Sequence, residues 1–113
     1  MVTIKDINSA KELISPYINS TPFLYSDSLS NNSVTVNLKL ESTQVTGSFK
    51  IRGALNKILN LSDKQKNNGV VAVSTGNHGK AVAYAAKIVG IKSTVFMSSL
   101  VPDHRLEAIE KLG

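Results

Sequence analysis

Short apolar runs that suit β-strands alternate along this chain with longer stretches of helical periodicity, and this alternation constrains the fold more than any other feature. The strand-like runs occupy residues 34–40, 70–73 and 93–97. Helical spacing of apolar residues marks residues 4–17, 48–61 and 77–90, and Pro102–Asp103 opens a last helix. Strands separated by helices of this length predict an α/β fold: an open, twisted, parallel sheet with flanking helices.

The length of the chain limits it to one domain. At 113 residues it can bury one hydrophobic core, and no repeat, low-complexity tract or flexible linker interrupts it. Its 42% hydrophobic and 19% charged residues are ordinary for a globular protein. We therefore treat residues 1–113 as a single continuous domain.

Composition excludes several classes of function. The absence of cysteine rules out disulfides, a thiolate nucleophile and a thiolate metal site, and we expect no metal. The net charge of +5 comes mostly from scattered lysines, and only 5% of residues are aromatic, so we expect no nucleic-acid partner. Neither an apolar run of membrane-spanning length nor a signal-peptide core is present, which predicts a cytoplasmic protein without a membrane partner.

Two loops that follow predicted strands should meet at the carboxyl edge of the sheet, where open α/β folds bind ligands. The first loop, residues 46–53, places Lys50 in the first turn of a helix. The helix dipole there disfavours a cation, and burial would disfavour it further, so the amine is expected to become neutral and able to form a Schiff base. The alternative interpretation is a solvated lysine that happens to lie early in a helix.

The second loop, residues 74–79, combines small residues with the start of a helix, which suits a bound carboxylate or phosphate. It matches neither the dinucleotide fingerprint nor a phosphate-binding P-loop. The alternative is a plain turn with Asn77 as helix cap and His78 as a surface or packed histidine. A phosphate- or nucleotide-binding module that does not need Lys50 also stays open.

Taken together, these motifs resemble the pyridoxal-phosphate-dependent serine/threonine dehydratases of fold type II, the tryptophan synthase β-like fold. The motifs that carry the resemblance are Lys39-Leu40-Glu41, Gln44, residues 46–54 (TGSFKIRGA) and residues 74–79 (STGNHG). The loop of residues 74–79 with residues 97–102 (MSSLVP) is also similar to dehydratases assigned to hydroxyectoine breakdown. Because members of the family are much longer, the resemblance implies the amino-terminal part of that fold, without the carboxyl-terminal portion of the large domain.

The resemblance also implies a role for each loop residue. Lys50 would hold pyridoxal 5'-phosphate covalently and then act as the base at the substrate α-carbon, and Thr75 would lie on the catalytic face. Phe49 would pack against the cofactor ring, and Asn77 would hydrogen-bond its phenolic oxygen. The substrate carboxylate would be held by Ser74, Thr75, Gly76, Asn77 and His78.

The implied reaction is β-elimination and deamination of threonine or serine to a 2-oxo acid and ammonia, by a homo-oligomer (a dimer) in the full-length form. The isolated chain is expected to be inactive. Two alternatives stay open: a serine racemase-like enzyme, disfavoured because Thr75 stands where racemases carry serine, and a non-enzymatic fragment that folds and self-associates. We also expect Arg52 to pair with Glu41 or another carboxylate, positioning the lysine loop without touching substrate.

Overall fold

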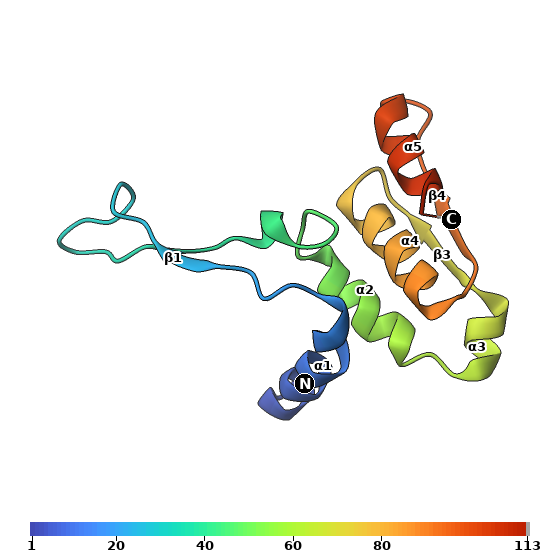
Figure 1. Cartoon of the computed structure of the whole chain (residues 1–113), viewed down its shortest axis with the longest axis horizontal. Coiled ribbons are helices and arrows are strands. Elements are labelled where there is room, and N and C mark those ends of the chain that lie inside the picture. Colours follow the sequence, from blue (N-terminus) through green and yellow to red (C-terminus); the bar gives the residue numbers. More distant parts are fainter. Residues whose placement is uncertain (113) are drawn as a thin grey trace.

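The computed structural model describes residues 1–112, in which helices α1, α2 and α4 form the body beside a small parallel sheet (Figure 1). The helices are α1 (Ile4–Ile14), α2 (Lys50–Leu59), α3 (Asp63–Asn68), α4 (Asn77–Val89) and α5 (Asp103–Glu110), with 3₁₀ turns at Ser15–Tyr17 and Glu41–Thr43. The strands are β1 (Phe23–Tyr25), β2 (Asn37–Lys39), β3 (Val70–Val73) and β4 (Ser93–Phe96).

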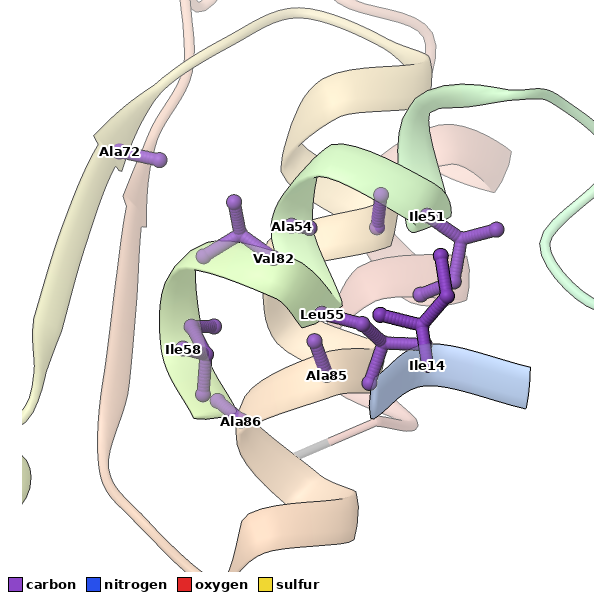
Figure 2. Packing of buried hydrophobic residues seen from close by; sticks show 10 residues of the cluster. Ile14, Ile51, Ala54, Leu55, Ile58, Ala72, Val82, Ala85 and Ala86 are labelled. Atoms are coloured by element: carbon purple, nitrogen blue, oxygen red, sulfur yellow. The ribbon is translucent and has the colours of Figure 1, made fainter. Parts of the chain in front are cut away.

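The hydrophobic core lies where α2 packs against α4, and α1 closes it on one side (Figure 2). Ile51 and Leu55 of α2 are fully buried, Ile14 is the one buried residue of α1, and Ala72 reaches the core from β3. Alanines at 81, 85 and 86 give α4 a smooth face, which allows the two helices to approach closely. The core therefore fixes the first turn of α2, where Lys50 lies.

Strands β3 and β4 pair in parallel, with Val71 opposite Thr94 and Val73 opposite Phe96. Ala72 and Val95 point toward α4, whereas the other face of the sheet is open to solvent, with Val73 81% exposed and Phe96 58% exposed. The loop after β3 leads into α4, and Gly90, in the left-handed conformation (φ 74°), ends that helix as the sequence predicted. This βαβ unit confirms the predicted parallel arrangement for residues 70–97.

The expected strand at residues 34–40 was wrong in extent and in its partner. Only Asn37–Lys39 is strand, and it pairs antiparallel with Phe23–Tyr25 in a separate ribbon that projects from the body (Figure 1). The parallel sheet therefore contains β3 and β4 alone within residues 1–112. Period-two alternation identifies an extended segment, but it does not reveal which strand the segment will join.

Helix α3 was not expected, because its sequence (DKQKNN) has no apolar stripe. A capping box starts it: the Ser62 hydroxyl accepts the Gln65 N–H, and the Gln65 side chain accepts the Ser62 N–H. Thr3 and Asp6 form the same kind of box at the start of α1. No helix among residues 1–112 has both the length and the apolar character that crossing a membrane requires.

Candidate active site

The loop that leads to Lys50 is folded tightly against the body. Thr46 and Ser48 are buried, Gly47 takes a positive φ of 77°, and the Gly47 N–H donates to the Gln44 carbonyl at 2.7 Å. The hydroxyls of Thr46 and Ser48 have no hydrogen-bond partner within residues 1–112. Buried hydroxyls normally have a partner, so this loop is the part of the described chain whose polar groups are least satisfied.

Lys50 is the first residue of α2, and its side chain is exposed. Its ammonium lies 4.9 Å from the centre of the Phe49 ring, and it makes no hydrogen bond or ion pair with any other residue in the described part of the chain. The expected burial of this amine was wrong for residues 1–112. A primary amine without an ion pair, beside a ring that is 57% exposed, is nevertheless free to react with an aldehyde.

The predicted pair between Arg52 and Glu41 is confirmed, and it is bidentate. Arg52 Nη2 donates to Glu41 Oε1 at 2.6 Å, and Nε donates to Oε2 at 2.8 Å. The hydrogen bonds from Arg52 lower the pKa of Glu41 to about 2. The same contact raises the pKa of Arg52. Both groups are thus charged at neutral pH, one turn into the helix that carries Lys50.

In the second loop, Ser74 closes the turn before α4. Its Oγ accepts the Gly79 N–H at 3.0 Å and the Gly76 N–H at 3.3 Å. Because Gly79 is the third residue of α4, Ser74 acts as the cap, and Asn77 is already inside the helix. The alternative interpretation of Asn77 as a helix cap is therefore wrong.

Thr75, Asn77 and His78 are exposed, and none of their side chains is hydrogen-bonded within residues 1–112. The backbone N–H groups at 77 and 78 have no acceptor inside the helix, as at any helix amino terminus. A pocket of about 240 Å³ opens at this end of α4 and contains side chains that the sequence did not single out as site residues: Lys80, His104 and Arg105, beside Gly76 and Asn77. Its basic groups and the helix dipole together suit an anion. Only the packing of α5 on α4 shows that these basic groups converge.

Helices α2 and α4 run in the same general direction, so their amino-terminal ends, at Lys50 and Asn77, face the same side of the molecule (Figure 1). The sequence argument had placed both loops at one sheet edge. The structure instead reaches a similar orientation by packing α2 on α4. Within residues 1–112 no hydrogen bond joins the two loops, so the individual roles of the seven predicted site residues stay predictions.

Comparison with protein families assigns the chain. The model of the pyridoxal-phosphate dependent enzymes matches residues 14–113, which include both loops. The chain belongs to this family. Pyridoxal 5'-phosphate is accordingly the family cofactor, and the free amine of Lys50 beside the exposed Phe49 ring fits a group that carries an aldehyde and a flat aromatic ring.

Curated relatives of this member of the pyridoxal-phosphate dependent enzymes carry dehydratase names. A putative threonine dehydratase of Sinorhizobium fredii is 49% identical over 113 residues, which is 99% of this chain and 34% of the relative. The L-threonine dehydratase catabolic TdcB of Staphylococcus aureus (strain USA300) is 44% identical, across 100% of this chain and 33% of its own length. The chain thus spans about a third of the length of these relatives.

Solved structures extend the similarity to racemases. Serine racemase from Dictyostelium discoideum superposes with a TM-score of 0.92 at 40% identity, and the match covers 99% of this chain and 37% of the racemase. A bacterial threonine deaminase, from T.th., gives a TM-score of 0.86 at 39% identity, covering 99% of this chain and 35% of the deaminase. These matches confirm the predicted α/β class and its fold type II relationship.

Proposed function

We propose that this chain carries the cofactor lysine and the carboxylate-binding loop of an enzyme that eliminates the β-hydroxyl of threonine or serine and releases ammonia. The observation that carries the proposal is the free amine of Lys50 at the start of α2, with the amino end of α4 facing the same side. The dehydratase names of the curated relatives support this reaction over others in the family.

Bound pyridoxal phosphate would supply an electron sink for the negative charge that develops at the substrate α-carbon. Lys50 Nζ would hold the cofactor and, once freed by the substrate amine, take the α-proton. The N–H groups at the amino end of α4 would orient the substrate carboxylate. With the β-hydroxyl lost as water and the C–N bond later hydrolysed, threonine yields 2-oxobutanoate and ammonia, and serine yields pyruvate and ammonia.

A racemase is the second candidate, because serine racemase from Dictyostelium discoideum is as similar in structure as the threonine deaminase. Racemisation needs a proton donor on the face of the substrate opposite the lysine. The residue at the position assigned to this task is Thr75, whose exposed hydroxyl has no partner within residues 1–112. Chiral analysis of serine incubated with an active form would separate the two reactions, since only a racemase accumulates the D-enantiomer.

The first test asks whether Lys50 is the cofactor lysine. The purified chain is mixed with pyridoxal phosphate, reduced with borohydride and mapped by peptide mass spectrometry, alongside Lys50→Ala and the control Lys57→Ala on the same helix. We expect the reduced adduct on Lys50, with the control variant labelled as in wild type. Labelling spread evenly over the exposed lysines would contradict the assignment.

Activity belongs to a longer chain, because this one spans about a third of its relatives. We expect the isolated chain to release no ammonia from threonine or serine. A chimera in which this chain replaces the matched third of the Sinorhizobium fredii relative should release ammonia and 2-oxo acid, and the same chimera with Lys50→Ala should not. An inactive chimera that folds and binds cofactor would argue against the dehydratase function.

A further inference from the structure

The amino end of α2 is weak by its own sequence. Phe49 precedes the helix without a side-chain cap, and Lys50 puts a cation at the positive end of the dipole. Gly53 lowers helix propensity within the next turn. A first turn of this kind frays unless contacts from outside the helix hold it, and the position of the Lys50 amine depends on that turn.

The outside contact is Glu41. Its carboxylate receives two hydrogen bonds from Arg52 and a third from Thr21 Oγ1, at 2.6 Å. Arg52 also donates its backbone N–H to the Phe49 carbonyl at 3.1 Å, so the residue that Glu41 holds is bonded directly to the turn around Lys50. Glu41 is consequently connected to the lysine turn through a single intermediate residue.

The segment that carries Glu41 is itself held in place by the chain before β1. Gln44, only 4% exposed, accepts the Asn19 N–H at 2.8 Å and donates to the Asn19 carbonyl at 2.9 Å. Lys39 Nζ donates to the Thr21 carbonyl at 2.7 Å. Residues 19–21, the turn at Glu41–Thr43 and α2 thereby form one hydrogen-bonded unit at the base of the β1–β2 ribbon.

We propose that Glu41 is a positioning residue for the cofactor lysine: through Arg52 and Thr21 it locks the first turn of α2 and so sets where the Lys50 amine lies. The proposal rests on the assignment of Lys50 made above. Glu41 itself does not act as an acid or base, because its two oxygens already accept three hydrogen bonds. Its low pKa, about 2, keeps the carboxylate charged across the working range of the enzyme.

The test compares wild type with Glu41→Gln, Arg52→Lys and the charge exchange that combines Glu41→Arg with Arg52→Glu. Glu107→Gln is the matched control, because Glu107 pairs with Lys111 at 3.7 Å on the exposed surface of α5. The first readout is the ratio of reduced pyridoxal phosphate adduct on Lys50 to that on Lys57. We expect this ratio to fall on the order of tenfold in Glu41→Gln, since small displacements of a reacting group slow its reaction strongly.

The second readout needs no cofactor. The Phe49 ring, 4.9 Å from the Lys50 ammonium, should shift the NMR signals of the Lys50 ε-methylene group, and this shift should vanish in Glu41→Gln while the circular dichroism of the fold is retained. The charge exchange should restore both readouts, and Glu107→Gln should change neither. Arg52→Lys, which keeps the charge but loses the bidentate geometry, should give intermediate values.

The two readouts separate failure of this proposal from failure of the proposed function. An unchanged methylene shift in Glu41→Gln overturns the positioning role, whether or not an adduct forms. Loss of the shift in Glu41→Gln without any preference for Lys50 in wild type supports the positioning role but rejects Lys50 as the cofactor lysine. Loss of both readouts that the charge exchange does not restore also overturns the proposal, because the pair itself would then not be the cause.

Discussion

At the scale of single residues, the Glu41–Arg52 pair gives the fold a dependence on acid. Hydrogen bonding lowers the pKa of Glu41 from its ordinary 4.5 to about 2 in the folded chain, so the unfolded chain takes up its proton first as the pH falls. The stabilisation is therefore complete above pH 4.5 and is lost between 4.5 and about 2. At neutral pH it amounts to about 1 to 2 kcal/mol, since the pair is partly exposed.

We expect Glu41→Gln to lower the free energy of unfolding at pH 7 by this amount, and the difference from wild type to shrink as the pH falls from about 4.5 toward 2. Urea denaturation of both proteins at several pH values measures it. Glu107→Gln, which breaks an exposed pair, should show a much smaller difference at every pH. A constant gap between Glu41→Gln and wild type from pH 7 to pH 3 would argue against the ion pair as its source.

At the scale of elements, the contact of α4 with β4 and α5 depends on Gly79. A Cβ at this position would lie 2.8 Å from Val95 Cγ1 and 3.3 Å from Ile109 Cδ1. Gly53, in the exposed part of α2, has no atom within 4 Å of the same point. The two glycines thus differ in packing although both lie in helices, and they form a matched pair for mutagenesis.

We expect Gly79→Ala to destabilise the chain by about 1 to 3 kcal/mol through overpacking. Gly53→Ala should be neutral or stabilising by up to about 1 kcal/mol, because alanine favours the helix. Thermal denaturation followed by circular dichroism compares them. Equal melting temperatures for the two variants would show that α4 can move away from β4 without cost, contrary to the close packing described.

At the scale of the whole molecule, the uncovered face of the β3–β4 sheet invites association. Val71, Val73 and Phe96 lie on this face and are all more than half exposed, and each strand has a free edge. This surface is the observation that favours a fragment that folds and self-associates without catalysis. Such a fragment would form oligomers yet show no preference for Lys50 in cofactor labelling.

We expect the isolated chain to self-associate at high concentration and Val73→Lys to reduce this, as measured by sedimentation velocity over a concentration series. Val2→Lys is the control, because Val2 is 76% exposed and Val73 81% exposed, but Val2 precedes α1 and lies away from the sheet. Equal association of the two variants would exclude the sheet face as the contact surface.

The sequence by itself determined the elements whose cause is local. Helix α4 and its end at Gly90, strands β3 and β4, and most of α2 follow from apolar periodicity and glycine within a few residues. The motifs around Lys50 and residues 74–79 pointed to the family and to its cofactor, and the Arg52–Glu41 pair could be foreseen from their charges and positions.

Only the tertiary structure decided what depends on distant partners. It paired β2 with β1 instead of with the parallel sheet, left Lys50 exposed, let Ser74 cap α4 in place of Asn77, and brought Lys80 and Arg105 into one pocket. Local periodicity reports which face of an element is apolar, whereas strand pairing and burial depend on which residues far along the chain, or beyond it, supply the opposing surface.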